Sequence, residues 1–270
     1  RLSHQILRWC TGQAGSAASR ILFVSGGRIY QVDADGHGLR ALTPAGQTAL
    51  SPTWSPDGSQ FGYVQLTDRG WSVILQRFAT GTRTTVPTTT DETNITPTFA
   101  PDGRHVIFAK SGERGTNLVR VNIAELCCAE RLTVGPFADN LSPVYSPDGR
   151  RVAFVSTRAG GQQIYVMGAD GTNQELLVPF DYGRTGNSNA PDWSPDGAMI
   201  TFHRETSRTP QIWVHDVARR SSRQLSSTGR NEDPSWAPDG RHIVFVSDRT
   251  GRGQLHVIDL DTGRVRQIVT

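Results

Sequence analysis

Three acidic residues stand at similar places in two related segments of the chain, and acidic residues grouped in this way can do chemistry. Asp192 lies in the segment 190–193, and Glu232 and Asp233 lie in the segment 231–236. Two carboxylates about 5 to 10 Å apart can hydrolyse a glycosidic bond, and grouped carboxylates can also bind a hard cation. The alternative is that these side chains pair with Arg230 or face solvent. Clustering around a pocket would favour the enzyme, and a dispersed, solvated arrangement would exclude it.

Other catalytic motifs are absent from the sequence. A nucleophile elbow needs Gly-x-Ser-x-Gly on a strand-to-helix turn, and no such string occurs. The seven histidines are dispersed, and none belongs to the His-Glu-x-x-His pattern of zinc proteases. Asp33 and Asp35 begin like a calcium loop, but the twelfth position holds Pro44 where the loop requires glutamate. The sequence therefore predicts no catalytic residue, no cofactor and no metal, and we expect a protein that is not an enzyme.

The cysteines leave several states open. Cys10, Cys127 and Cys128 are an odd number without a Cys-x-x-Cys pair, which argues against a structural zinc site. The adjacent Cys127 and Cys128 can form a strained vicinal disulfide, or one of them can pair with Cys10. Alternatively, both are small, half-buried apolar side chains on a strand.

Charge and hydropathy exclude two classes of partner. The chain has 28 basic and 25 acidic residues, a net charge of +3, and Lys110 is its only lysine. The arginines are scattered, so no basic stripe predicts nucleic-acid binding. The longest apolar runs, such as Val152 to Val155, have four or five residues, whereas a membrane-spanning helix needs about 20. We expect a chain that neither binds nucleic acid nor spans a membrane.

An internal repeat organises the sequence. Five copies of an octapeptide, x-Pro-x-aromatic-Ser/Ala-Pro-Asp-Gly, start at Ser51, Thr96, Ser142, Ala190 and Asp233. The aspartate of Pro-Asp-Gly falls at positions 57, 102, 148, 196 and 239, in steps of 45, 46, 48 and 43 residues. A fixed motif at this period is typical of β-propeller blades.

Each repeat has the pattern of a four-stranded antiparallel blade. In the tetrapeptide Ser/Ala-Pro-Asp-Gly, proline presets φ, aspartate bonds its own backbone and glycine accepts a positive φ, so a tight turn between two strands is predicted. A short alternating strand, a Gly/Arg-rich loop, a third strand, a second turn and a last strand follow. Six such units fill residues 20–270. We therefore expect an all-β, six-bladed β-propeller.

The two ends of the chain depart from the repeat. Leu2, Ile6 and Leu7 give residues 1–19 a rough helical stripe, which predicts a short helical linker or the end of a preceding domain. The first unit lacks the strand that carries Pro-Asp-Gly in the others, and nothing after Thr270 supplies it. Either the propeller lacks its closing C-terminal strand, or its first blade has three strands.

Two further residue types recur at fixed positions of the repeat. Trp54, Trp193 and Trp236 share one register and are predicted to pack between blades. Asn94 and Asn140 lie in Asn-x-Thr/Ser sequences, which suggest glycosylation in a secreted eukaryotic protein. Because both asparagines occupy the same repeat position and the repeat's proline follows, turn geometry explains them better.

These motifs resemble a known family. Residues 142–171, with Ser-Pro-Val-Tyr-Ser-Pro-Asp-Gly followed by Val-Ala-Phe-Val-Ser and Ile-Tyr-Val-Met, are similar to PD40 propeller repeats. Residues 4–15, running into Arg-Ile-Leu-Phe-Val at 20–24, resemble the linker that leads into the propeller of the TolB family. The resemblance covers essentially the whole chain. Compared with the family, this sequence lacks the preceding α/β domain and the final Pro-x-Trp-Ser-Pro strand.

The resemblance implies a non-enzymatic, protein-binding propeller of the Tol-Pal envelope system in a bacterial periplasm. Such propellers dock the peptidoglycan-associated lipoprotein Pal at the mouth of their channel, and the family's N-terminal segment engages TolA. The complex helps to keep the outer membrane attached and constricting during division. We expect a monomer that is peripheral to the outer membrane, with the Pal side present and the TolA side in the missing N-terminal region.

The resemblance also implies which residues bind the partner. Residues just before the repeat's proline should face the channel mouth, on loops carried by a rigid scaffold. Matching the repeat to the family's partner-contacting positions points to Thr93, Thr96, Leu141 and Ser142, and repeat equivalence adds Asn189, Ala190, Glu232 and Asp233. For each residue the alternative is a solvated loop position that bonds within a turn. The alternative function is an enzyme-associated propeller, either a peptidase lid or a carbohydrate-processing domain that uses carboxylates of the mouth.

Overall fold

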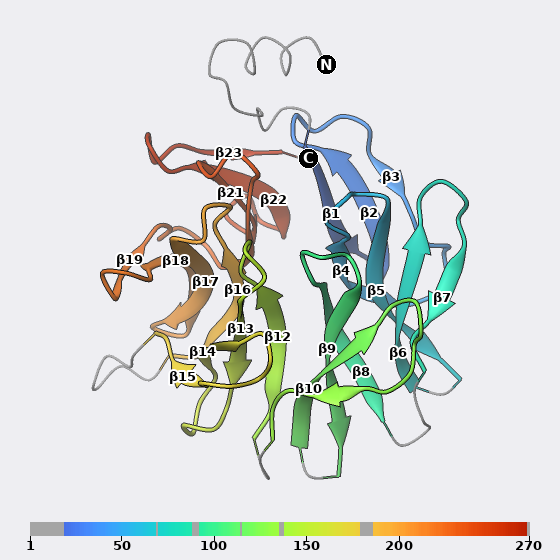
Figure 1. The fold of residues 1–270 in the computed structure, drawn as a ribbon. Helices are drawn as coiled ribbons and strands as arrows, with labels where there is room; N and C mark the ends of the chain where they lie inside the picture. Colours follow the sequence, from blue (N-terminus) through green and yellow to red (C-terminus); the bar gives the residue numbers. More distant parts are fainter. Residues whose placement is uncertain are drawn as a thin grey trace. The chain divides into compact units, whose positions relative to one another are not determined.

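The computed structural model describes residues 19–68, 70–87, 92–113, 115–134, 138–178 and 186–268. In these ranges the regular structure is entirely β and forms six sheets (Figure 1). The predicted all-β, six-bladed propeller fold is confirmed. The helix expected within residues 1–19 lies outside the described residues except for Ser19. No helix in the described part has the length and hydropathy to cross a membrane.

The chain divides into two compact units. We call Leu22–Gln31 with Arg40–Glu175 the central unit, and the described residues up to Ile21, Val32–Leu39 and those from Leu176 onward the terminal unit. The first sheet contains three strands within the described residues, which are β1 (Arg20–Ser25), β2 (Arg28–Asp33) and β3 (Arg40–Ala41).

The central unit contains three four-stranded blades. Their strands are β4 (Ala49–Trp54), β5 (Gln60–Thr67), β6 (Gly70–Arg77) and β7 (Arg83–Thr85); β8 (Thr93–Phe99), β9 (His105–Gly112), β10 (Gly115–Asn122) and β11 (Glu130–Arg131); and β12 (Asn140–Tyr145), β13 (Arg151–Ser156), β14 (Gln163–Gly168) and β15 (Glu175–Leu176). The strands that carry the repeat's first proline contact one another in order, β4 with β8 and β8 with β12.

The terminal unit contains the last two blades. Their strands are β16 (Ser188–Trp193), β17 (Met199–Thr206), β18 (Thr209–Asp216) and β19 (Ser221–Gln224); and β20 (Asn231–Trp236), β21 (His242–Ser247), β22 (Gln254–Asp259) and β23 (Val265–Gln267). Here β16 contacts β20, which repeats the arrangement of the central unit. The Arg266 guanidinium also donates to the carbonyl of Ala34 (3.2 Å), so residues 32–39 are held to the last strand.

The Ser/Ala-Pro-Asp-Gly tetrapeptides form the predicted tight turns between the first two strands of each repeat. In the first copy the Gly58 N–H donates to the carbonyl of Ser55 (2.9 Å), and Gly58 has a φ of 66°. The Asp57 carboxylate accepts the Ser55 hydroxyl (2.7 Å) and the Ser59 N–H (3.1 Å). These donors stabilise the charged form and lower the pKa of Asp57 to about 2. The turn is therefore held by the aspartate as well as by the backbone.

The second turn of a blade also brings neighbouring blades together. Gly171, in the Asp170-Gly171 turn of the β12–β15 blade, has a φ of 86°, and a Cβ at this position would lie 2.5 Å from the carbonyl oxygen of Leu132 in the preceding blade. Gln174 donates to the same carbonyl (3.1 Å). Glycine is required here because both the φ and the close approach exclude a side chain.

Each repeat also has a β-bulge that the sequence pattern did not predict. The residue before the repeat's first proline has a positive φ in all five copies, between 49° and 51°, at Ser51, Thr96, Ser142, Ala190 and Asp233. The ladder shifts register at the same place in each of these five blades, for example between Leu141 and Val144. A bulge of this kind bends the strand and re-aims the side chain before the proline.

The tryptophans of the repeat fill the core to different degrees. Trp193 is 4% exposed and Trp236 is also buried. Trp236 of β20 packs in one cluster with Ile212 and Val214 of β18, which belongs to the preceding blade, so its predicted packing between blades is confirmed. Trp54 is only half-buried and stacks on Phe78, with ring centroids 5.1 Å apart.

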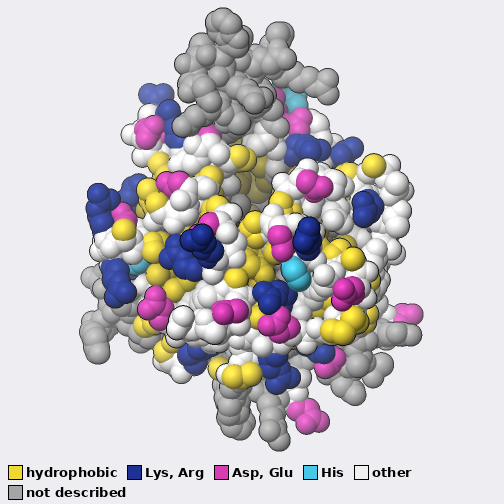
Figure 2. Space-filling view, viewed as in Figure 1, with side chains coloured by type: hydrophobic (Ala, Val, Ile, Leu, Met, Phe, Trp, Pro, Cys, Tyr) yellow, Lys and Arg dark blue, Asp and Glu magenta, His cyan; other side chains and the backbone are white. Residues whose placement is uncertain are grey.

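Charges of both signs are interspersed over the face shown in Figure 2. Many arginines form ion pairs, such as Arg120 with Glu130 (2.6 Å), Arg219 with Asp216 (2.7 Å) and Arg241 with Asp259 (2.6 Å). Exposed pairs of this kind contribute about 0 to 1 kcal/mol each. They balance the surface charge, whereas burial of apolar side chains holds the blades together.

Candidate functional site

Four of the predicted partner-binding residues lie in the central unit, on the neighbouring strands β8 and β12. Thr96 and Ser142 are the bulged residues of their strands, and the Ser142 N–H donates to the Thr96 hydroxyl (3.2 Å). The structure thus brings these two residues into direct contact. Thr93 is half-buried at the start of β8, where its carbonyl accepts the Ser111 hydroxyl (3.4 Å). Leu141 packs against the hydrophobic core of this unit, so it has a structural role.

The two asparagines of the sequons are buried beside these residues and have different surroundings. Asn140 is 1% exposed and Asn94 is 0% exposed, so neither is accessible for glycosylation. The Asn140 amide donates to the carbonyl of Thr116 (3.0 Å) and accepts from the Ser156 hydroxyl (2.9 Å) and the Arg158 guanidinium (3.0 Å). The amide oxygen and nitrogen of Asn94 have no hydrogen-bond partner among the residues that the structure describes. At the same position of the repeat, the amide is therefore bonded in the β12–β15 blade and has no described partner in the preceding blade.

The other four predicted residues lie in the terminal unit. Asn189 pairs with His203 across β16 and β17, and Ala190 is half-buried at the bulge. Glu232 binds the Arg230 guanidinium (2.8 Å), which is the pairing that the sequence left open. The Asp233 side chain is 72% exposed. Of these four residues only Asp233 is exposed, and the other three are half-buried.

His203 joins this group, although the sequence analysis did not select it. Its Nδ1 accepts the N–H of Asp233 (3.2 Å), and the Asp233 carboxylate is 3.9 Å from the same nitrogen. Burial lowers the pKa of His203, although nearby carboxylates, Asp233 and Glu232 among them, act in the opposite direction. A neutral ring that accepts at Nδ1 carries its proton on Nε2. His203 could be found only from the strand register, because it pairs with Asn189 across β16 and β17.

Asp192 differs from Glu232 and Asp233 in its hydrogen bonds. Its carboxylate oxygen accepts the Ser235 hydroxyl (2.9 Å) and the Trp236 N–H (2.8 Å), which link β16 to β20. Burial raises its pKa to about 6, although both of these donors favour the charged form. Each of the three carboxylates thus has surroundings of its own: Asp192 links two blades, Glu232 pairs with an arginine and Asp233 faces solvent. This arrangement gives no support to a hydrolytic acid pair.

The half-buried Asp192 makes a testable contribution to the pH dependence of stability. Because its pKa is about 6 in the folded chain and 3.8 without burial, the native state binds this proton more tightly than the unfolded state. Its contribution is present below pH 3.8 and is lost as the pH rises through 6. The difference corresponds to at most about 3 kcal/mol. We expect Asp192→Asn to gain up to this amount relative to the unchanged chain between about pH 4 and pH 7.5, measured by urea unfolding.

Asp196 is the matched control for this experiment, since it lies in the turn that follows β16. The Ser194 hydroxyl (2.6 Å) and the Ala198 N–H (3.0 Å) lower its pKa. Its contribution to stability therefore has the opposite sign and is lost on acidification. Asp196→Asn should flatten the acid side of the profile. The same pH dependence in both variants would contradict the assignment of Asp192.

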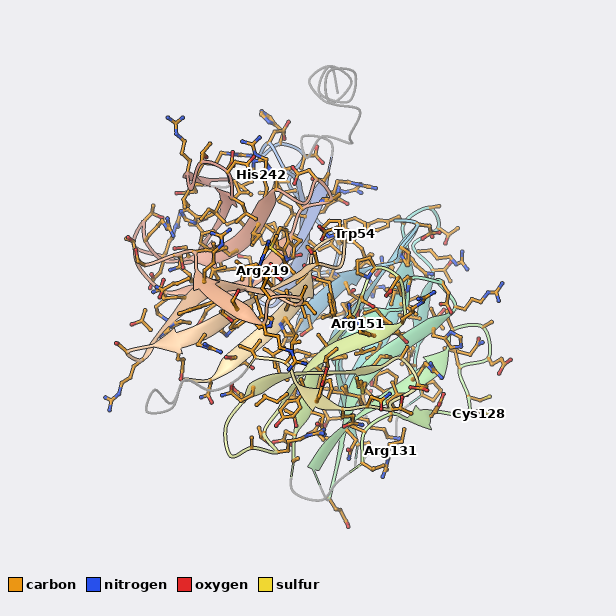
Figure 3. The ribbon with its side chains drawn as sticks, turned by 60° about the vertical axis from the view of Figure 1, so that its left-hand side comes forward. Trp54, Cys128, Arg131, Arg151, Arg219 and His242 are labelled. Carbon is orange, nitrogen blue, oxygen red and sulfur yellow. The ribbon has the colours of Figure 1, made fainter. Side chains whose placement is uncertain are left out.

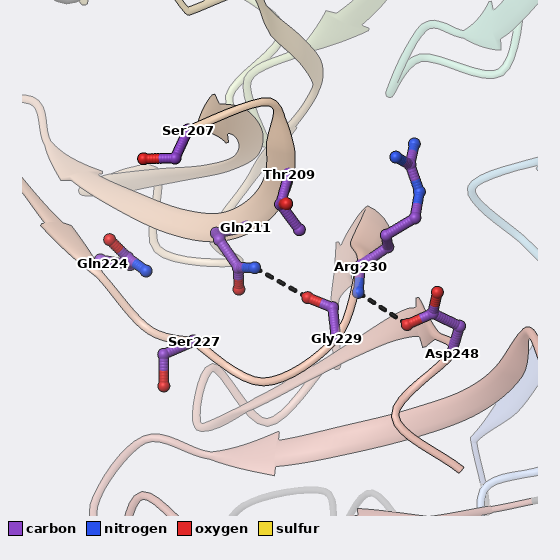
Figure 4. Close-up of a pocket in the computed structure, with 8 residues that line it drawn as sticks. All are labelled: Ser207, Thr209, Gln211, Gln224, Ser227, Gly229, Arg230 and Asp248. Atoms are coloured by element: carbon purple, nitrogen blue, oxygen red, sulfur yellow. Dashed lines mark hydrogen bonds between the residues drawn. The ribbon is translucent and has the colours of Figure 1, made fainter. Parts of the chain in front are cut away.

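A polar pocket of about 520 Å³ lies between the last two blades, within the terminal unit (Figure 4). It is lined by Ser207, Thr209, Gln211, Gln224, Ser227, Gly229, Arg230 and Asp248. The Gln211 amide donates to the carbonyl of Gly229 (2.8 Å), and the Asp248 carboxylate accepts the Arg230 N–H (2.7 Å). The first bond holds β18 to the loop before β20, and the second holds that loop to Asp248, directly after β21. The lining therefore serves the packing of two blades, and no group of three or more potential metal ligands occurs among the described residues.

Comparison with known sequences identifies related proteins. A family model described as the TolB beta propeller domain matches residues 8–180 and 181–270. The Tol-Pal system protein TolB of Methylococcus capsulatus is 32% identical over 91 residues, which are 31% of this chain and 22% of that protein. The aligned part thus spans about a fifth of that relative.

Solved structures show the same fold. The crystal structure of TolB from Acinetobacter baumannii matches 98% of this chain and 67% of that chain, with a TM-score of 0.85 and 24% identity. A puromycin-hydrolysing peptidase of Mycobacterium tuberculosis matches 93% of this chain and 45% of that chain, with a TM-score of 0.66 and 16% identity. At such low identity these likenesses concern the propeller fold alone.

Proposed function

Because this chain belongs to the TolB beta-propeller domain family, we propose that it is a non-enzymatic, protein-binding component of the Tol-Pal system. It would act in the periplasm and dock the lipoprotein Pal, and so help to maintain the outer membrane during cell division. The observation that carries this proposal is the match of the family model to residues 8–180 and 181–270. TolA would be engaged by the family's N-terminal region and not by the propeller.

The geometry of the central unit supports Thr96 and Ser142 as the centre of the docking surface. Both residues are half-buried, both have a positive φ, and a hydrogen bond joins the two strands that carry them. A surface held in this way loses little conformational freedom when a partner binds, which favours affinity. Thr93, three residues before Thr96 on β8, would extend the same surface.

The terminal unit would contribute a second group of contacts. Asn189 and Ala190 are half-buried on β16, and Glu232 and Asp233 add two carboxylates on β20. Rim charges of this kind affect the association rate and its dependence on salt more than the final affinity. We therefore expect Asp233→Asn to change the rate of association with Pal at low salt and to leave the dissociation rate nearly unchanged.

The proposal predicts that charge and bulk at the bulge abolish docking without unfolding the protein. We expect the double variant Thr96→Arg/Ser142→Arg to bind the soluble domain of Pal from the same organism at least tenfold more weakly than the unchanged chain, on the order of a loss of 1.4 kcal/mol. Titration calorimetry measures the binding, and thermal unfolding followed by circular dichroism verifies the fold.

Asn173→Arg is the matched control, because Asn173 is exposed, has a φ of 53° and lies in the connection between β14 and β15 of the same unit. It introduces the same side chain on the same kind of backbone after the end of β14 that pairs with Arg151, whereas Ser142 lies near the end of β12 that pairs with Ser156. Its affinity for Pal should equal that of the unchanged chain. No binding of Pal by the folded, unchanged chain would overturn the proposed function, and equal binding by the double variant would overturn only the proposed surface.

A further inference from the structure

Cys127 and Cys128 are adjacent and exposed in the connection between β10 and β11. Figure 3 labels Cys128 on this connection, close to Arg131 of β11. The two Sγ atoms are 2.7 Å apart, closer than sulfur atoms in ordinary van der Waals contact. Of the states that the sequence left open, a half-buried pair on a strand is wrong, because both side chains are exposed and lie between strands.

The backbone before the pair is held in place. The Asn122 side chain accepts the N–H groups of Ala124 (2.9 Å) and Glu125 (3.4 Å), and the Asn122 carbonyl accepts the N–H of Leu126 (2.9 Å). Leu126 has a φ of 52° and Cys128 a φ of 57°, so two left-handed residues flank Cys127. The partly buried Leu126 packs against the hydrophobic core of the central unit. The turn therefore presents two sulfur atoms side by side with little freedom to separate.

We infer that Cys127 and Cys128 form a reversible two-electron redox site, which closes to a vicinal disulfide and opens again by exchange with disulfides and dithiols. In the closing reaction one of the two cysteines attacks, as its thiolate, one sulfur of an external disulfide and displaces the other sulfur as a thiolate. The second cysteine then loses its proton and attacks the sulfur of the first, which displaces the second external thiolate. Two cysteine S–H protons are released, one S–S bond forms and one breaks, and the external disulfide gains the two electrons.

The two thiols are close enough for the second step of the exchange. The pKa of Cys127 is raised, chiefly because its thiol shares a hydrogen bond with Cys128. After a mixed disulfide forms at either cysteine, the other thiol is already within reach of its sulfur, since the two Sγ atoms are 2.7 Å apart.

The same geometry makes the site reversible. Adjacent Cα atoms are about 3.8 Å apart across a trans peptide, whereas disulfides usually join Cα atoms about 4.4 to 6.8 Å apart. A vicinal disulfide is therefore strained, and strained, exposed disulfides are reduced more readily than structural ones. The pair is thus suited to a labile role.

The site is independent of the proposed docking surface. In the sheet order β11-β10-β9-β8, the cysteines precede the edge strand β11, while Thr96 lies on β8 at the opposite edge. Oxidation of the pair should therefore leave the affinity for Pal unchanged. A failure of either proposal would not affect the other.

Peptide mapping tests the inference directly. Cleavage after Arg120 and Arg131 places both cysteines in one tryptic peptide, 121–131, while Cys10 falls in the peptide 9–20. The folded chain is treated with oxidised glutathione, its free thiols are blocked with N-ethylmaleimide, and the peptides are weighed. We expect the peptide 121–131 to lose the mass of two hydrogen atoms and to carry no blocking group. Dithiothreitol added before blocking should restore two blocked thiols.

Three variants serve as controls. Cys127→Ser and Cys128→Ser should each abolish the loss of mass and leave a single glutathione adduct or one blocked thiol, and Cys10→Ser should leave the result unchanged. Since Cys127 and Cys128 are exposed, both serine variants should melt like the unchanged chain. Two glutathione adducts on the peptide 121–131, a cross-link to the peptide 9–20 or a cross-linked dimer would each overturn the inference.

Discussion

Replacing Trp193 with alanine is expected to lower the free energy of unfolding by about 3 to 5 kcal/mol. Trp193 ends β16 and is 4% exposed, so its removal leaves a large cavity in a core that cannot close around it. Urea unfolding followed by circular dichroism measures the loss. The slope of the transition should stay the same, because the variant exposes the same surface when it unfolds.

Trp54 provides the comparison for this prediction, since it occupies the same register of the repeat. It is half-buried and stacks on Phe78. We expect Trp54→Ala to cost about half as much as Trp193→Ala, because less apolar surface is removed from the core. A larger loss for Trp54→Ala than for Trp193→Ala would mean that the burial of the two blades is assigned wrongly.

The second large effect is expected at Asn140. Its amide makes three hydrogen bonds, one of them from the Arg158 guanidinium. Arg158 itself is exposed, and its guanidinium carbon lies 4.8 Å from the ring centroid of Tyr165. Asn140→Ala would leave the buried Ser156 hydroxyl without its acceptor and the Thr116 carbonyl without its donor, which should cost about 2 to 4 kcal/mol.

Asn94→Ala is the matched variant, because Asn94 occupies the same position in the preceding blade. Its amide has no hydrogen-bond partner within the described residues, so alanine removes no described hydrogen bond and relieves the burial of an unsatisfied group. We expect a change within about 1 kcal/mol of zero. Thermal and urea unfolding of both variants would test the contrast, and equal losses would show that the amide of Asn94 is bonded in solution.

The contrast between these asparagines shows where sequence reasoning stops. Both precede a repeat proline by three residues, and the pattern treats them alike. Across the strand, however, Asn140 faces Ser156, whereas Asn94 faces Lys110. The Lys110 ammonium binds Glu92 (2.8 Å) and supplies nothing to the amide. The environment of each asparagine depends on the partner strand, which the octapeptide does not encode.

The candidate site divides in the same way. The repeat identified the strands β8, β12, β16 and β20 and the position before each proline. It did not predict the positive φ at that position, because the bulge arises from the pairing of two strands. It did not predict that the half-buried Leu141, one of the proposed contact residues, also packs against the core. His203 entered the site through the register of β16 and β17.

By itself the sequence determined the all-β fold, the number of blades and the Pro-Asp-Gly turns, because each follows from local conformational preferences that recur at a constant period. The tertiary structure decided which polar groups are satisfied, which carboxylates face solvent and which are buried, and how close the two cysteine sulfurs lie. These properties depend on contacts between residues far apart in the chain or on the backbone angles of one particular turn. Hydrogen bonds and desolvation act through distance and burial, and the repeat pattern specifies neither.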